Sequence, residues 1–300
     1  MSSRKDEHRE MSKSISAKIM SSLLQFWPKL TAQESEQKIS EALKKGEIPT
    51  ALPKNIVTRH VDNENGRIFY VNEKSVSRYI VFYIHGGAYR HDFVAPHWQF
   101  IDKLVKETNA QVIAPAYRLV PFATYKEAFD LIVPVYKDFC EKNPEKKIMI
   151  MGDSAGGGLA LALTEYFKAE GIRLPDELIL FSPWVDISME NEEIKDYQSE
   201  DPFLFSDSLI VAGRHWAGDL DVHDYRVSPI YGDLEGIHNV TVFVGTDGIL
   251  YPDAVKMFHK LDRHVSNELI VGEGMNHVYP LFPIEEAASA CNKVFHTVLR

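Results

Sequence analysis

The order of apolar and polar positions along the chain predicts strands that alternate with helices. Residues 79–84 form a continuous apolar run, which is typical of a strand buried on both faces of a sheet. A β-hairpin is expected before this run, at residues 56–60 and 68–72 with Asn65-Gly66 as its turn. Further strand patterns follow at residues 111–114, 147–151, 177–181, 241–245 and 268–271. Helical patterns separate them at about residues 97–107, 124–141, 155–169, 252–263 and 284–299. This alternation predicts an α/β fold in which helices flank a mostly parallel central sheet.

Two segments fall outside the alternation. Residues 15–30 carry apolar side chains at helical spacing, which predicts a helix packed on its own domain, a helix lying on a membrane surface, or a flap over a site. These apolar positions are Ile15, Ile19, Leu23, Phe26, Trp27 and Leu30. Residues 187–232 are rich in Asp, Glu and aromatic side chains. Because long structureless loops are uncommon unless they are functional, this insertion is expected to cap a site.

Composition narrows the classes of function. The chain of 300 residues is 45% hydrophobic, which is enough for one large core, so a single domain over residues 1–300 is expected. The formal net charge of −10 disfavours nucleic acid as a partner, since phosphate binding needs clustered Lys and Arg. The sequence has no long apolar run and no signal-peptide pattern, so no membrane span is expected. The two cysteines, Cys140 and Cys291, lack metal-ligand spacing and fit a reducing compartment, so a cytoplasmic protein is expected.

The sharpest motif is a serine between glycines at a predicted strand-to-helix turn. Residues 152–156 read G-D-S-A-G, directly after the strand at 147–151 and before the helix at 155–169. This context is the one that the G-x-S-x-G motif needs to present a serine nucleophile, here Ser154. The non-catalytic alternative is a glycine-rich turn whose role is only to pack a helix against a sheet. A P-loop is excluded because no Gly-Lys-Ser/Thr follows the glycines.

A second glycine-rich loop follows the buried strand at 79–84. Residues 85–88 read H-G-G-A, which is similar to the HGGG-type loop whose backbone amides form an oxyanion hole. Such amides stabilise the negative charge that develops on a carbonyl oxygen during acyl transfer. The expected donors are the N–H groups of Gly86, Gly87, Ala88 and Ala155. The histidine at 85 is expected to hold the loop rather than to carry protons.

A serine hydroxyl needs a base, and the base needs an orienting acid. His277 lies just past the last predicted strand and is the candidate base among the 12 histidines. Asp247 lies just past the strand at 241–245 and is the preferred acid, with Asp253 as its rival. The sequence thus predicts a triad of Ser154, Asp247 and His277, with no metal and no cofactor.

Together these motifs make the chain resemble the hormone-sensitive-lipase-like family of α/β-hydrolase esterases. The resemblance covers about residues 55–300, and it includes further matches at residues 117–121, 182–186 and 228–229. Three positions depart from the family pattern: Ala88 replaces the usual third glycine, Ala116 replaces an acid, and Gly248 replaces a bulkier residue. The resemblance implies an α/β-hydrolase fold with a cap built from about residues 1–50 and 187–220.

The resemblance also implies an activity. It implies a serine carboxylesterase or lipase that hydrolyses small esters with short acyl chains through an acyl-enzyme intermediate. Its expected partner is thus a small-molecule ester. Two alternatives stay open at this point: a small-ligand receptor on the same fold, as the plant gibberellin receptors are, and an amidase or peptidase with the same machinery.

Overall fold

The fold is built on an eight-stranded sheet with the strand order β1-β2-β4-β3-β5-β6-β7-β8. The computed structural model describes residues 13–26, 29–48, 56–261 and 266–300. The strands are β1 (Arg59–Asn63), β2 (Gly66–Val71), β3 (Tyr79–Ile84), β4 (Gln111–Tyr117), β5 (Lys147–Asp153), β6 (Glu177–Phe181), β7 (Val240–Gly245) and β8 (Glu268–Gly272). Strand β2 pairs antiparallel with β1 and β4, and all other neighbouring pairs are parallel. The predicted α/β fold with a mostly parallel sheet is confirmed.

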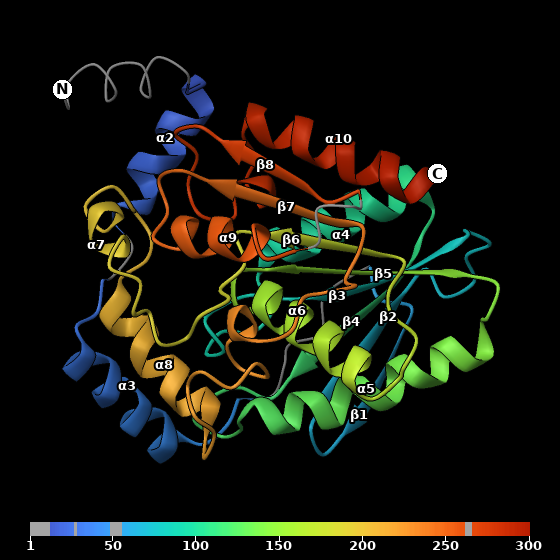
Figure 1. The fold of residues 1–300 in the computed structure, drawn as a ribbon, viewed down its shortest axis with the longest axis horizontal. Coiled ribbons are helices and arrows are strands. Elements are labelled where there is room, and N and C mark those ends of the chain that lie inside the picture. The colour runs from blue at the N-terminus through green and yellow to red at the C-terminus, as the bar shows by residue number, and fades with distance from the viewer. Residues whose placement is uncertain (1–12, 27–28, 49–55, 262–265) are drawn as a thin grey trace.

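Helices cover both faces of the sheet. The helices beside it are α4 (Ala95–Thr108), α5 (Tyr125–Lys142), α6 (Ser154–Ala169), α9 (Tyr251–Phe258) and α10 (Glu285–Leu299). Every residue of β3 is buried, and successive side chains point to opposite faces. Phe82 packs in the core under α5 and α6, whereas its neighbour Tyr83 packs in the core under α4 and α10. Figure 1 shows these two helical layers on either side of the strands.

Within the described residues, four further helices lie beyond the carboxyl ends of the parallel strands (Figure 1). They are α2 (Ile15–Leu24), α3 (Ala32–Lys45), α7 (Ile194–Tyr197) and α8 (Ser206–Ala217). Helices α3 and α8 pack together, and the hydroxyl groups of Ser35 and Ser208 are 3.3 Å apart between them. The Arg90 guanidinium donates to both hydroxyls, at 2.7 and 2.6 Å. The N-terminal segment and the 187–232 segment are therefore joined to each other. Two short 3-10 helices, η1 (Pro229–Tyr231) and η2 (Tyr279–Leu281), complete the fold.

Helix α2 packs on the domain as expected, but through the face opposite to the predicted one. Its apolar positions Ile15, Ile19 and Leu23 are 57–77% exposed. The buried residues are Ala17 and Leu24 instead. Polar contacts explain this orientation, because the N-cap residue Ser14 bonds to Glu286 in α10 and Ser21 bonds to Asn276 in the loop after β8. Trp27 lies outside the described residues.

The hairpin is displaced from its predicted position. Strand β1 covers Arg59–Asn63 rather than residues 56–60, and Asn63 pairs with Gly66 across the turn. All five residues of β1 are exposed, so no burial pattern marks this edge strand in the sequence.

The described part of the chain has no helix that is long and apolar enough to span a membrane. Cys140 and Cys291 are free thiols. No cluster of three or more His, Cys, Asp or Glu side chains within the described ranges could hold a metal ion.

Candidate active site

Ser154 sits at a sharp turn between β5 and α6. Its backbone φ is +52°, in the left-handed region that residues other than glycine rarely adopt. The turn requires the flanking glycines. A Cβ on Gly152 would lie 2.3 Å from the Gly156 carbonyl oxygen, and a Cβ on Gly156 would lie 2.2 Å from the Ile84 carbonyl oxygen. The strand, the turn and the helix can therefore pack this closely only with glycine at both positions.

The loop after β3 lies directly against this turn. A Cβ on Gly86 would lie 2.9 Å from the Ser154 Cβ atom and 2.3 Å from Asp153 Oδ2. Gly87 and Ala88 continue the loop with φ values of +116° and +52°. Among the described residues, no hydrogen bond uses the N–H of Gly87 or Ala88. The N–H of Ala155 belongs to the first turn of α6, where amides have no partner within the helix. Within the described residues, the predicted donors thus keep their N–H groups out of other hydrogen bonds, with one exception.

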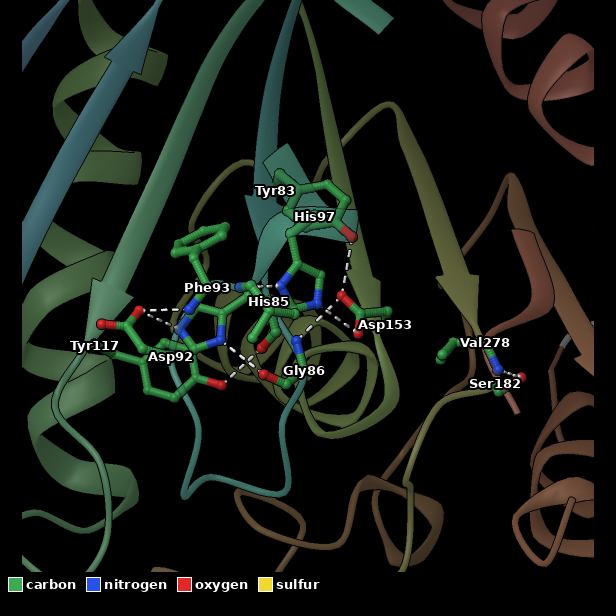
Figure 2. Close-up of polar contacts among 11 residues, drawn as sticks. Tyr83, His85, Gly86, Asp92, Phe93, His97, Tyr117, Asp153, Ser182 and Val278 are labelled. Atoms are coloured by element: carbon green, nitrogen blue, oxygen red, sulfur yellow. Dashed lines mark hydrogen bonds and ion pairs between the residues drawn. The ribbon is translucent and has the colours of Figure 1, made fainter. Parts of the chain in front are cut away.

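That exception is Gly86, whose N–H donates to the buried carboxylate of Asp153 at 3.1 Å. The Tyr83 hydroxyl donates to the same oxygen at 2.9 Å, and His97 Nε2 lies 3.3 Å from the other oxygen (Figure 2). Val94 N donates to His97 Nδ1 at 3.0 Å, so the neutral ring carries its proton on Nε2 and donates it to Asp153. Burial raises the pKa of Asp153, but His97, Tyr83 and the Gly86 amide outweigh it and lower the pKa below the usual value. Asp153 thus fixes the loop to the serine turn.

Sequence reasoning did not assign this role to Asp153, although the residue stands inside the G-x-S-x-G motif. The sequence did contain a signal for this role: a carboxylate next to the predicted nucleophile, to which no step of the predicted reaction gives a function. A buried carboxylate in such a place needs hydrogen-bond donors.

His85 holds the same loop, as expected. Its Nδ1 donates to the Gly86 carbonyl at 2.7 Å, and its ring stacks on Tyr117 with centroids 4.4 Å apart. The Tyr117 hydroxyl in turn donates to the His85 carbonyl oxygen at 2.7 Å (Figure 2). Burial lowers the pKa of His85, which keeps the ring neutral despite the nearby Asp92 carboxylate.

His277 lies on the loop after β8 and is buried. The segment after β6 connects this loop to the nucleophile. Trp184 N donates to the Ser154 carbonyl at 2.8 Å, and Val278 N donates to the Ser182 hydroxyl at 3.0 Å (Figure 2). The loop that carries His277 and the Ser154 turn thus both bond to one short segment, residues 182–184.

Burial lowers the pKa of His277 to about 4, and the negative charge of Asp153 opposes this shift. A lowered pKa means that the ring is protonated only at lower pH. The imidazole is therefore neutral above about pH 4, which is the state that a general base requires. Its Nδ1 atom has no hydrogen-bond partner among the described residues.

Of the two candidate acids, Asp247 lies beside the histidine loop. Its N–H donates to the Met275 carbonyl at 3.0 Å, and a Cβ on the next residue, Gly248, would lie 3.8 Å from the His277 Cα atom. The Asp247 carboxylate forms an ion pair with Lys13. The rival, Asp253, lies in the first turn of α9 and accepts a hydrogen bond from Asn191 at 2.7 Å. Burial raises the pKa of Asp253 to about 6.

The loop before α8 covers the histidine. The Phe203 ring centroid lies 6.0 Å from that of His277. Asp201 anchors this loop, because its carboxylate accepts from the N–H groups of Phe203 and Leu204 and from that of Ile249, two residues beyond Asp247. The 187–232 segment therefore lies over the strand ends that carry the candidate triad.

Comparison with known proteins relates the chain to enzymes of one fold. A family model described as the alpha/beta hydrolase fold matches residues 81–281. An esterase from Acinetobacter venetianus is 34% identical over 186 residues, which cover 61% of this chain and 61% of the relative. An acetyl-hydrolase from Streptomyces hygroscopicus is 28% identical over 175 residues, or 58% of each chain. The chain thus spans about three fifths of the length of these curated relatives.

Solved structures match over nearly the whole chain. A crystal structure of an esterase from the bacterial hormone-sensitive lipase family superimposes with a TM-score of 0.79 at 22% identity, covering 96% of this chain and 98% of the other. An esterase/lipase from an uncultured bacterium gives a TM-score of 0.78 at 22% identity, covering 95% and 98%. At this level of identity the likeness shows the fold alone.

Proposed function

Because the chain belongs to the family of proteins with the alpha/beta hydrolase fold, we propose that it is a serine carboxylesterase that acts on small esters with short acyl chains. The family membership confirms the resemblance predicted from the motifs. The activity, the acyl-enzyme mechanism and the residues that perform it are our proposal. The names of the relatives, an esterase and an acetyl-hydrolase, support the same class of reaction.

One observation carries the proposal. The strained Ser154 turn, with φ of +52°, touches the Gly86 backbone on one side and the segment that contacts the histidine loop on the other. Backbone strain of this kind persists only where the surrounding structure holds it, and it gathers at functional sites. A turn that served only to pack α6 on the sheet would need neither the unused amides nor a buried neutral imidazole nearby.

The proposed reaction has two steps. The Ser154 hydroxyl oxygen attacks the ester carbonyl carbon while His277 accepts the hydroxyl proton. The tetrahedral intermediate collapses, the alkoxide leaves with the proton from His277, and the acyl group stays on Ser154. Water then attacks the acyl-enzyme with His277 again as the base, and it releases the carboxylic acid and the free serine.

The oxyanion donors that we propose are the N–H groups of Gly87, Ala88 and Ala155. The sequence predicts the Gly86 N–H as a further donor. Because this N–H donates to Asp153 instead, we assign Gly86 the role of holding the loop against the serine turn. Donors of this type act by being held in place before charge develops, and the loss of one costs about 3 kcal/mol in the barrier. The Asp153 anchor would supply that rigidity.

We propose that α2, α3, α7 and α8 form a cap that closes the site from the solvent. Supporting contacts are the Ser35–Ser208 contact between α3 and α8 and the position of Phe203 over His277. A cap that lies close over the strand ends leaves little room for a long acyl chain. This restriction is the physical basis for expecting short-chain esters as substrates.

The acyl-chain preference gives a direct test of the proposed substrate class. We expect kcat/KM for p-nitrophenyl esters to be highest at acyl chains of about two to six carbons and to fall steeply for longer chains, because each extra methylene would meet the cap instead of gaining apolar burial. The measurement is initial-rate kinetics over a series from acetate to palmitate. A maximum beyond about ten carbons would reject this substrate class. The matching p-nitroanilides, run in parallel, test the amidase alternative.

A further inference from the structure

The loop of residues 85–92 carries proposed oxyanion donors and is fixed at its start, where the Gly86 N–H donates to Asp153. Ala88 and Tyr89 follow with φ values of +52° and +57°, a conformation that residues other than glycine rarely adopt. Two such residues in succession keep this backbone path only where neighbouring structure holds it. A second attachment is therefore expected at the end of the loop.

Tyr89 provides part of this attachment. Its ring stacks on that of Trp216 in α8, with centroids 3.9 Å apart and planes 1° from parallel. The centroid of the Trp184 ring lies 5.5 Å from that of Tyr89, and all three residues are at most 1% exposed. The Tyr89 hydroxyl donates to the Ala155 carbonyl at 3.0 Å, in the first turn of α6. The tyrosine thus joins the loop both to α8 and to the helix that begins at Ser154.

Arg90 provides the other part, because its guanidinium bonds to α3 and α8 at once. Nη1 donates to the Ser35 hydroxyl of α3 at 2.7 Å, and Nη2 donates to the Ser208 hydroxyl of α8 at 2.6 Å. The N–H groups of Arg90 and of the residue after it both donate to the Gly87 carbonyl at 3.0 Å. That carbonyl shares a planar peptide unit with the Ala88 N–H, one of the proposed donors. The guanidinium thus anchors the backbone that holds this peptide unit.

The packing of α3 on α8 does not by itself require this cation. The Ser35 and Ser208 hydroxyls are 3.3 Å apart and would still bond to each other without Arg90. Burial lowers the pKa of Arg90, and none of the described charged groups offsets this shift. Its Nε atom is buried without a hydrogen-bond partner among the described residues. A partly buried guanidinium held by two neutral hydroxyls is a costly way to join two helices, which points to a role in the loop that bears it.

We propose that Arg90 is a positioning residue: its bonds to α3 and α8 hold the proposed oxyanion donors, Gly87 and Ala88, where negative charge develops on the carbonyl oxygen of the ester. This inference rests on the proposed function. Preorganised donors stabilise the transition state more than the bound ester, so Arg90 should affect kcat rather than KM. The same bonds make catalysis depend on α3 and α8 being packed against the loop.

The first test removes the guanidinium and measures kcat and KM separately for p-nitrophenyl acetate. Arg90→Met removes the charge and both hydrogen bonds and keeps most of the side-chain volume. We expect kcat to fall about ten- to a hundredfold with KM within about threefold of the wild type, because misplaced donors weaken the transition state alone. Arg90→Lys keeps the charge and can bond to one hydroxyl, so it should recover part of the loss. Arg214→Met is the matched control, since Arg214 is exposed on α8, and its kcat should stay within about twofold of the wild type.

A mutant cycle tests whether the effect of Arg90 passes through α3 and α8. Ser35→Ala combined with Ser208→Ala removes both acceptors and leaves the guanidinium in place. We expect this variant to lose kcat to an extent similar to Arg90→Met, and the variant with all three changes to lose no more than the larger of the two. Losses that multiply in the combined variant would show that Arg90 acts through other contacts, and they would overturn the inference.

Hydrogen–deuterium exchange of the free protein measures the hold on the loop without any substrate. In Arg90→Met, the amides of residues 90 and 91 should exchange about tenfold faster than in the wild type, because their bonds to the Gly87 carbonyl open more often. The melting temperature should stay within a few degrees of the wild type, since the contact between Ser35 and Ser208 remains.

Three results would each overturn the inference: unchanged exchange in Arg90→Met, a rise in KM at unchanged kcat, or a loss of kcat that only follows unfolding of the variant at the assay temperature. The exchange measurement also separates this inference from the proposed function. If the wild-type protein hydrolysed no ester while its exchange responded to Arg90→Met as expected, the attachment of the loop would stand and the proposed function would fail.

Discussion

Replacing Ser154 by alanine is expected to lower kcat for p-nitrophenyl acetate about ten-thousand-fold or more, because the variant has no oxygen to carry the acyl group. The remaining rate would come from the oxyanion amides and from substrate binding alone. The side chain is buried in a tight turn, and alanine removes one oxygen without adding volume, so the fold should persist. Steady-state kinetics of the purified variant measure the loss, and circular dichroism checks the fold.

Ser22→Ala is the control for this comparison. Ser22 is exposed on α2, and its hydroxyl bonds only to the Lys18 carbonyl of its own helix among the described contacts. Its removal should leave kcat within about twofold of the wild type. If Ser154→Ala kept more than about one hundredth of the wild-type rate, the nucleophile would have to be another residue.

The second large effect concerns the acid. Asp247→Asn is expected to lower kcat by roughly a thousand- to ten-thousand-fold, because an amide neither holds the correct imidazole tautomer nor stabilises the imidazolium. Asp253→Asn is the matched comparison, since Asp253 lies six positions further along the chain, in α9, and accepts a hydrogen bond from Asn191. Its kcat should stay within a few-fold of the wild type.

Kinetics of the two variants side by side separate the roles of these carboxylates. A large loss in Asp253→Asn together with a small loss in Asp247→Asn would reverse the assignment. Equal losses of kcat would indicate damage to the segment that runs from Asp247 into α9. Thermal unfolding of both variants distinguishes that case.

The central strands were predictable because their residues are buried on both faces. An apolar run such as residues 79–84 has one stable place, the inside of a parallel sheet, and β3 occupies it. The edge strand β1 has five exposed residues, so its position depends on pairing with β2 rather than on burial, and the prediction missed it by three residues at its start. Sequence patterns record burial, and they record strand pairing poorly.

The segments proposed as a cap were harder to predict than the sheet. Helix α8 was expected only as part of an irregular insertion. Its buried face includes small residues such as Ser208 and Gly213, and a Cβ on Gly213 would lie 2.7 Å from the Ile187 side chain. The same face carries Leu209, Ala212 and Trp216 at helical spacing, a signal that the expectation of an irregular insertion missed. The prediction for helix α2 is wrong in the opposite way, because its apolar stripe predicts burial of residues that are exposed.

The loops of the candidate site were predictable from topology, but their partners were not. Carboxyl ends of parallel strands meet at one edge of a sheet, so residues after β3, β5, β7 and β8 must gather there. Contacts that depend on the direction of individual side chains do not follow from the topology and leave no pattern in the sequence. The bonds from Tyr83 and His97 to Asp153, and the pair between Lys13 and Asp247 at a separation of 234 positions, appear only when the chain is folded.

The most direct test of the proposed nucleophile is the site at which an organophosphonate reacts. A fluorophosphonate transfers its phosphonyl group to an activated serine oxygen, fluoride leaves, and the adduct is stable to digestion. Mass spectrometry of the digested native protein should find the added mass on the peptide that contains Ser154, and heat-denatured protein should remain unlabelled because the serine is activated only by the folded site. Labelling of a different serine in the native protein, with Ser154 unmodified, would contradict the account.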